Sequence, residues 1–251
     1  MISYLRDATI RNQSLHPDVI PIINSLDRAD FIDFNSYTPE QKQKYKTPYT
    51  FLAHPFYKDQ TIPSAHKRIN FLNKALKEWK NKNLKLLEIG AGALYSSILL
   101  SKACPDLLIN SSEIIPKIAN IAQANLNKYN LENHINIIDT SKNTKSIEED
   151  APYDIITSTL ALSNQTHLEN LLDLLDKNGE LDICFVKKGN TKNKTNAQIW
   201  HPNESITSRE IYHSPTSVDK VRAISYIFKK RKDKVFYAHS PTGGGLSPLL
   251  K

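Results

Sequence analysis

Hydrophobic and polar residues alternate along the middle of the chain in a pattern typical of strands separated by helices. Short apolar runs are each followed by a segment whose apolar residues recur every three or four positions. The apolar runs predict strands at 84–89, 107–111, 135–138, 153–158 and 180–186. The periodic segments predict helices at 64–81, 95–102, 116–129 and 167–175, and Asn178 and Gly179 predict a turn.

Strands that alternate with helices at this spacing form a parallel sheet with helices on both faces. Right-handed crossovers leave few alternatives to a doubly wound arrangement. The strand pattern returns at 223–228 and 235–239, on either side of a basic turn. The sequence therefore predicts an α/β fold: a Rossmann-like, doubly wound, mostly parallel seven-stranded sheet with an antiparallel C-terminal edge hairpin.

The chain divides by pattern into three regions. Residues 1–82 read as helices and loops, residues 83–190 as the sheet core, and residues 191–251 as edge strands with a basic tail. Within the first region, positions 18–26 have helical apolar spacing and Pro39 begins a polar segment. Aromatic residues then cluster near Pro48 and Pro55, which predicts an ordered loop rather than a linker. These aromatic residues are Tyr49, Phe51, Phe56 and Tyr57.

The composition is that of a soluble globular protein. Of 251 residues, 39% are hydrophobic, and mean hydropathy is −0.46. We expect no membrane span, because no run of about 18 apolar residues occurs. The N-terminus lacks the apolar stretch of a secretory signal, so we expect a cytoplasmic protein. Cys104 and Cys184 lie singly in apolar segments, which predicts buried, reduced thiols.

The chain carries a formal net charge of +7, much of it in the C-terminal third. A basic surface raises the local concentration of acidic or phosphorylated partners. Lysine is abundant throughout, however, and basic residues do not interleave with aromatic ones as they do where bases stack. A nucleic-acid partner is therefore possible but not favoured. The basic residues concerned are Lys187, Lys188, Lys192, Lys194 and the run 229–232.

The most informative stretch is 86–95, Leu-Leu-Glu-Ile-Gly-Ala-Gly-Ala-Leu-Tyr. A strand approaches its end at Glu88, and Gly90 and Gly92 allow a sharp turn that brings the backbone close to a ligand. Glu113 ends the next strand, where a carboxylate can accept hydrogen bonds from both ribose hydroxyls of a nucleoside. A dinucleotide site would need a third glycine where Tyr95 stands, so a methyl donor is favoured over NAD. Glycines that serve the turn alone are the remaining alternative.

With these residues in place, the stretch resembles the first motif of class I methyltransferases. The form with Glu-Ile-Gly and tyrosine is similar to protein-L-isoaspartate O-methyltransferases. Further segments resemble that family in order and spacing, over about residues 20–190. They are 28–32 (Arg-Ala-Asp-Phe-Ile), Tyr49, Gln60-Thr61-Ile62 with His66, 151–156 (Ala-Pro-Tyr-Asp-Ile-Ile) and 178–181 (Asn-Gly-Glu-Leu).

The resemblance implies S-adenosyl-L-methionine as cofactor and a carboxylate of a peptide or protein as methyl acceptor. An acceptor carboxylate is ionised at pH 7 and needs positioning rather than a base. No metal is implied, and residues 1–82 are expected to contribute to the acceptor pocket. The implied cofactor residues are Glu88, Gly90, Ala91, Gly92, Glu113, Ile114, Asp139 and Thr157. The implied acceptor-side residues are Asp59, Gln60, Thr61, Ser64 and His66.

The chain also departs from the family pattern. Leu94 replaces the third glycine of the first motif, and Pro63 replaces a serine that contacts substrate. Asp59 replaces a glycine, Phe51 replaces an aspartate, and Asp139 or Ser141 would have to contact the adenine. The donor site is thus expected to be retained and the acceptor pocket rebuilt. Methylation of a small molecule or RNA, or a catalytically silent S-adenosylmethionine-binding protein, are the alternatives.

Overall fold

A computed structural model describes residues 15–47, 53–57, 60–63, 65–141, 145–162, 165–188, 198–200, 221–231, 234–239 and 247–248. The chain divides into two compact units. The first comprises Met1–Asn83 and Ala91–Ser141, and the second comprises Leu84–Gly90 and Lys142–Lys251.

The first unit contains helices whose ends follow local sequence signals. Thr38 and Gln41 form a capping box at the start of α3, and Pro39 occupies its first turn. Helix α6 begins at Pro116 and ends at Tyr129, and the C-cap residue Asn130 has the left-handed conformation common at helix ends. The helices are α2 (Val19–Asn24), η2 (Arg28–Phe31), η3 (Phe34–Ser36), α3 (Pro39–Tyr45), α4 (Ala65–Glu78), α5 (Tyr95–Ala103) and α6 (Pro116–Tyr129).

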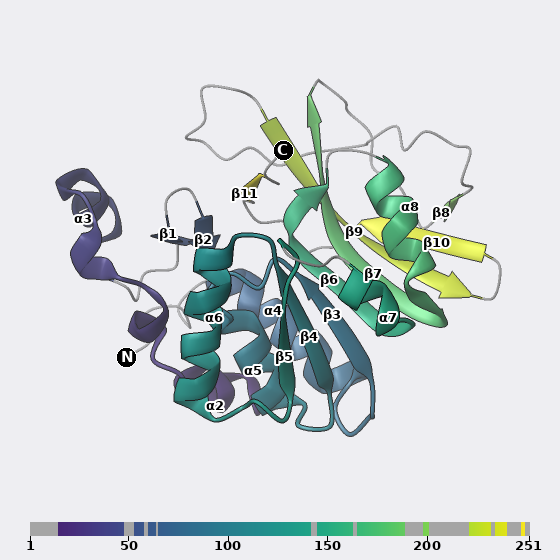
Figure 1. Cartoon of the computed structure of the whole chain (residues 1–251), viewed down its shortest axis with the longest axis horizontal. Coiled ribbons are helices and arrows are strands. Elements are labelled where there is room, and N and C mark those ends of the chain that lie inside the picture. The colour runs from purple at the N-terminus through teal and green to yellow at the C-terminus, as the bar shows by residue number, and fades with distance from the viewer. Residues whose placement is uncertain are drawn as a thin grey trace. The chain divides into compact units, whose positions relative to one another are not determined.

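Two parallel strands of this unit carry candidate residues at their carboxyl ends. Strand β4 (Leu108–Glu113) pairs with β5 (Ile135–Asp139), so that Glu113 lies opposite Asp139. Helices α5 and α6 both contact this pair (Figure 1). Consecutive residues Ser111, Ser112 and Glu113 are all buried, which shows that both faces of β4 are covered, as in a parallel sheet.

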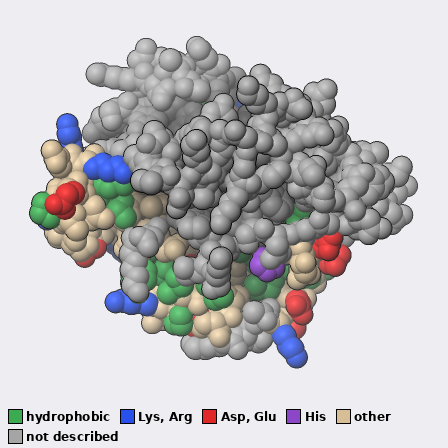
Figure 2. Space-filling view, turned by 90° about the horizontal axis from the view of Figure 1, so that it is seen from above, with side chains coloured by type: hydrophobic (Ala, Val, Ile, Leu, Met, Phe, Trp, Pro, Cys, Tyr) green, Lys and Arg blue, Asp and Glu red, His purple; other side chains and the backbone are tan. Residues whose placement is uncertain are grey.

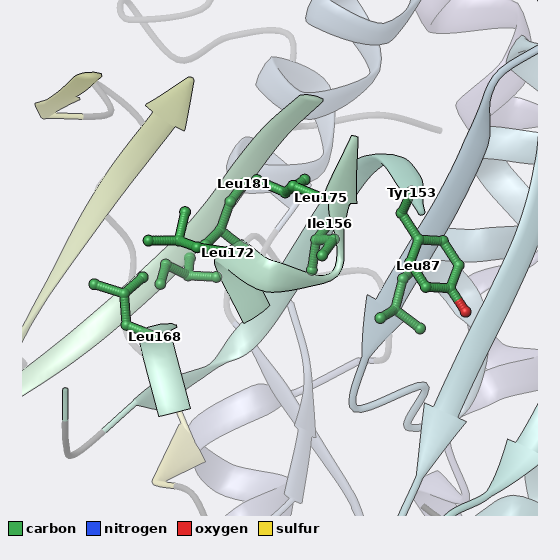
Figure 3. Close-up of a cluster of buried hydrophobic side chains, with 8 residues drawn as sticks. Leu87, Tyr153, Ile156, Leu168, Leu172, Leu175 and Leu181 are labelled. Atoms are coloured by element: carbon green, nitrogen blue, oxygen red, sulfur yellow. The ribbon is translucent and has the colours of Figure 1, made fainter. Parts of the chain in front are cut away.

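The second unit is a mixed sheet in the order β3-β6-β7-β9-β10-β8, with β11 beside β6. Its first three strands are parallel, and β9 and β10 form the predicted antiparallel hairpin. Apolar residues of β3, β6, β7 and α8 form its core (Figure 3). The elements are β3 (Lys85–Ile89), β6 (Tyr153–Leu162), β7 (Leu175–Lys188), β8 (Gln198–Trp200), β9 (Val221–Arg231), β10 (Lys234–His239), β11 (Ser247–Pro248), α7 (Lys145–Glu149) and α8 (Gln165–Asp173).

The predicted Rossmann-like α/β fold is confirmed, but two local predictions were wrong. Strand β7 runs through Asn178 and Gly179, which lie at a register irregularity within the strand rather than at a turn before it. The expected loop near Pro55 contains strands β1 (His54–Tyr57) and β2 (Gln60–Ile62), which pair antiparallel. Strand β7 depends on pairing partners distant in the sequence, which local patterns do not encode. Strands β1 and β2 pair with each other, but they are only four and three residues long and include Pro55, so the alternation that marks a strand is too short to recognise.

The environment of Cys104 agrees with its sequence pattern. Cys104 is buried, and this burial raises the pKa of its thiol to about 11, so the thiol stays protonated at neutral pH. The described part of β7 contains Cys184. Among the helices described, none is both long and apolar enough to cross a bilayer.

The register irregularity in β7 generates a stability prediction. A Cβ atom at Gly179 would lie 2.9 Å from Leu175 Cδ2 and 3.0 Å from the carbonyl oxygen of Tyr153. Because the backbone oxygen cannot rotate away, Gly179→Ala should lower the free energy of unfolding by about 1–3 kcal/mol. Chemical denaturation measures this loss, with Lys177→Ala at an exposed neighbouring position as the control. Equal stability of the two variants would contradict the packing at Gly179.

Candidate functional site

The glycine turn, residues 90–94, connects β3 to α5 and is held by backbone contacts. Gly90 and Gly92 have φ angles of 82° and 54°, in the region that favours glycine. The Ala91 N–H donates to the Ser112 carbonyl at 2.8 Å, and the Leu94 N–H donates to the Ala91 carbonyl at 2.9 Å. The turn is therefore fixed against the end of β4.

Leu94 is also left-handed, with a φ of 66°, although it is not glycine. That conformation costs a side-chain-bearing residue about 1–2 kcal/mol. Two features offset the cost: Leu94 is fully buried, and Asn125 Nδ2 on α6 donates to the Ala93 carbonyl at 2.9 Å. Both ends of the Ala93–Leu94 peptide are thus hydrogen-bonded. The turn therefore accommodates Leu94 at the position where the resemblance led us to expect a glycine.

The Glu113 carboxylate accepts three backbone hydrogen bonds. Oε2 accepts from the Gly92 N–H at 3.1 Å, and Oε1 accepts from the Ile114 and Ile115 N–H groups, both at 3.0 Å. An ionised carboxylate offers about four acceptor positions. Glu113 therefore joins the glycine turn to the start of α6 and keeps about one acceptor position, on Oε2, for a ligand hydroxyl.

Two predicted cofactor residues lie beside Glu113. Asp139 is opposite it on β5, and its Oδ1 accepts from the Ser141 N–H at 3.1 Å and from the Ser141 hydroxyl. Ile114 leaves the end of β4 with 58% of its surface exposed. The edge thus combines a hydroxyl acceptor, an apolar side chain and a second carboxylate. A nucleoside has groups that match all three.

Strand β1 covers part of the glycine turn. The Phe56 ring lies so close that a Cβ atom at Gly92 would be 3.6 Å from its Cζ. At the neighbouring position, the Lys117 ammonium lies 5.5 Å from the centroid of the Tyr57 ring. Lys117 is in the first turn of α6. Opposite these residues on β2, Gln60 pairs with Tyr57 and Thr61 with Pro55. The structure therefore brings two predicted acceptor residues, Gln60 and Thr61, to a strand pair that contacts the glycine turn.

Buried polar side chains from the N-terminal segment hold this strand pair. The Tyr37 hydroxyl donates its one proton to the Pro55 carbonyl. In its second hydrogen bond, with His54 Nδ1 at 3.2 Å, Tyr37 Oη is therefore the acceptor and the His54 ring N–H is the donor. Arg28, only 4% exposed, donates from Nη2 to the Pro63 carbonyl at 3.1 Å. Burial, and secondarily the Arg28 charge, lowers the pKa of His54 to about 4, so this ring is neutral at pH 7.

A family model described as protein-L-isoaspartate(D-aspartate) O-methyltransferase matches residues 1–211. The chain belongs to this family. It is accordingly an S-adenosylmethionine-dependent methyltransferase. A search of curated proteins found no match.

Two solved structures resemble the methyltransferase in fold. One is a putative protein-L-isoaspartate O-methyltransferase from Plasmodium falciparum in complex with S-adenosyl-L-homocysteine. The two sequences are 16% identical, and the two structures superpose with a TM-score of 0.62. The match covers 92% of this chain and 90% of the Plasmodium falciparum chain. The other is titled protein-L-isoaspartate O-methyltransferase, with 18% identity and a TM-score of 0.59 over 92% of this chain and 62% of its own. The methyltransferase thus spans about three fifths of the second structure's length.

The family-like segment 28–32 of the methyltransferase packs against the helices that flank the glycine turn. The Phe31 ring meets Tyr95, the first residue of α5, at 4.9 Å and stacks on Tyr129 of α6 at 5.6 Å. Asp30 accepts a hydrogen bond from the Tyr129 hydroxyl and pairs with Lys128, both at 2.7 Å. The segment therefore anchors the N-terminal region to helices α5 and α6 of the same unit.

The remaining predicted residues lie on other elements or outside the described chain. In the second unit, buried Glu88 on β3 lies opposite Thr157 on β6, and the Ser158 hydroxyl donates to the Ile89 carbonyl at 3.2 Å. His66 lies in α4. The predictions for Asp59, Ser64, Tyr49 and Phe51 fall outside the described residues.

Sequence reasoning missed Asn125, and it missed two sets of contacts: that of Phe56 with the glycine turn, and those of Arg28, Tyr37 and His54 around the β1–β2 pair. Asn125 could have been found, because it follows Ile118 and Ala122 on the buried stripe of α6. A polar residue at such a position needs a hydrogen-bond partner. The two sets of contacts had no comparable local signal, since they join segments far apart in the sequence.

The buried His54 predicts an acid sensitivity of the methyltransferase. Its pKa is about 6.5 in the unfolded chain and about 4 in the folded protein, so between these values protons bind preferentially to the unfolded chain. Stability is full above about pH 6.5 and falls by about 3 kcal/mol as the pH drops to 4.

Denaturation at pH 7 and pH 4.5 of the native protein, His54→Gln and exposed His167→Gln measures this effect. The His54→Gln protein should lose less stability on acidification than either of the others. An equal loss in all three would contradict the assignment to His54.

Proposed function

We propose that the methyltransferase binds S-adenosylmethionine at the carboxyl ends of β4 and β5, against the glycine turn. The support is the set of groups that surround Glu113. Oε2 of Glu113 has a remaining acceptor position for a ribose hydroxyl, Ile114 offers an apolar surface for an adenine, and Asp139 or Ser141 offers polar contacts. Gly92 lets the ligand approach the backbone. Glu88, Gly90 and Thr157 remain predictions for the second unit.

We further propose that the acceptor is a carboxylate of a peptide or protein. When bound, S-adenosylmethionine supplies an activated methyl group on a sulfonium. A carboxylate acceptor is already ionised at neutral pH, so the protein has no proton to remove. Its contribution is to orient the acceptor and exclude water, which is an effect of proximity.

The residues that carry this proposal lie on the β1–β2 pair. Gln60 and Thr61 are half-buried and carry hydrogen-bonding side chains, and the next residue, Ile62, is buried. Pro63 replaces the family's substrate-contacting serine, and its carbonyl is occupied by Arg28. The acceptor contacts at this position must therefore differ from those of the family. Isoaspartyl and other carboxylates are both candidates, and peptide assays separate them.

Single substitutions test the cofactor site. Glu113→Ala should abolish measurable S-adenosylhomocysteine binding in calorimetry, because the variant loses both the ribose acceptor and three backbone contacts. Gly92→Val should do the same, because a β-branched residue is strained at a φ of 54°. Glu132→Ala, at an exposed glutamate of the same unit, is the control. Native-like affinity in folded Glu113→Ala would refute the site.

A labelling experiment tests the acceptor class. Incubation with methyl-labelled S-adenosylmethionine and paired isoaspartyl and aspartyl peptides should produce base-labile label, as methyl esters release methanol in alkali. Label that enters RNA or a small molecule of a cell extract instead would contradict the carboxylate proposal. Tight cofactor binding without any labelled product would identify a catalytically silent protein.

The described surface gives RNA no particular support. On the face seen in Figure 2, the Lys and Arg side chains of the described residues lie apart from one another and are interspersed with Asp and Glu. A phosphate-tracking surface would gather basic groups in a stripe. The described side chains on this face therefore give no support to a nucleic-acid acceptor.

A further inference from the structure

Phe56 occupies an unusual place in the β1–β2 pair. Pro55 pairs with Thr61 and Tyr57 pairs with Gln60, which leaves Phe56 without an opposite residue at a register irregularity. Bulges of this kind redirect a side chain and occur often beside active sites. Here the redirected ring lies against Gly92, the glycine whose N–H donates to Glu113.

The backbone on both sides of Phe56 is also held in place. At the residue before Phe56, the Pro55 carbonyl accepts a hydrogen bond from Tyr37, and His54 of the same strand is buried. At the residue after β2, the Pro63 carbonyl accepts a hydrogen bond from Arg28. The Phe56 side chain itself is half-buried, so part of its surface remains available to a ligand. An aromatic side chain on an anchored strand therefore borders the proposed cofactor site.

The chemistry of the donor suggests what such a surface does. In S-adenosylmethionine the sulfonium is attached to the ribose C5′ carbon, so a ribose bound at Glu113 keeps the positive charge near Gly92. The face of an aromatic ring attracts a cation. The neighbouring Tyr57 ring already does so, with the Lys117 ammonium at 5.5 Å. After methyl transfer the sulfonium becomes a neutral thioether, and this attraction disappears.

We propose that Phe56 is a specificity-determining residue whose ring stabilises the sulfonium of the bound donor and so favours S-adenosylmethionine over S-adenosylhomocysteine. This inference rests on the proposed cofactor site. It has a functional consequence: the ring strengthens substrate binding without equally strengthening binding of the product. A ring that served only as an apolar cover over Gly92 would affect both ligands alike.

Calorimetric dissociation constants for both ligands test the inference in the native protein, Phe56→Leu and Phe56→Trp. Phe56→Leu keeps an apolar side chain but loses the ring, so S-adenosylmethionine affinity should fall about tenfold and S-adenosylhomocysteine affinity less than about twofold. Phe56→Trp should retain or increase the preference for the donor, since tryptophan binds cations best. Phe71→Leu, the same change at a half-buried ring on α4, should alter neither affinity.

A second series guards against misfolding of Phe56→Leu. Fluorinated phenylalanines at position 56 withdraw charge from the ring face with little change of shape, and the donor preference should fall with each added fluorine. Equal losses for both ligands, or no loss for the donor, would overturn the role of Phe56. Failure of the native protein to bind either ligand would instead overturn the proposed cofactor site.

Discussion

The Glu113 carboxylate ties three parts of the first unit together. It accepts hydrogen bonds from Gly92 in the turn and from Ile114 and Ile115 at the entrance to α6. Buried carboxylates require such partners, because an uncompensated charge in the interior is costly. Glu113 therefore shapes the turn before any ligand binds, and a ribose would meet a carboxylate already fixed in orientation. Pre-organisation of this kind reduces the ordering cost of binding.

The same constraint explains how the turn tolerates Leu94. A left-handed leucine persists only where its surroundings over-determine the backbone. Here Leu94 is buried, and the peptides before it are fixed by hydrogen bonds. Asn125 donates to the Ala93 carbonyl, and the Gly92 N–H donates to Glu113. On the other side of the turn, Phe56 closes over Gly92. The left-handed Leu94 thus lies in a turn that contacts residues on β4, α6 and β1.

The sequence was informative where structure is local. Periodicity placed the strands and helices, and with them Glu113 at a strand end and Gly92 in the turn that follows a strand, because ligands of such sheets bind at the carboxyl ends of the strands. Asp139 was proposed from the family resemblance alone. Periodicity failed for β1 and β2, which are short, contain Pro55 and are held by Arg28 and Tyr37 from distant segments. It also missed that Glu113 devotes most of its acceptor capacity to backbone N–H groups.

If Glu113 couples the glycine turn to ligand binding, the amide resonances of its three donors report that coupling most directly. In a nuclear magnetic resonance titration with S-adenosylhomocysteine, Gly92, Ile114 and Ile115 should shift together, with one common dissociation constant, as a ribose hydroxyl joins the shared carboxylate. Saturable binding that leaves these three amides unmoved, while others shift, would contradict this role of Glu113.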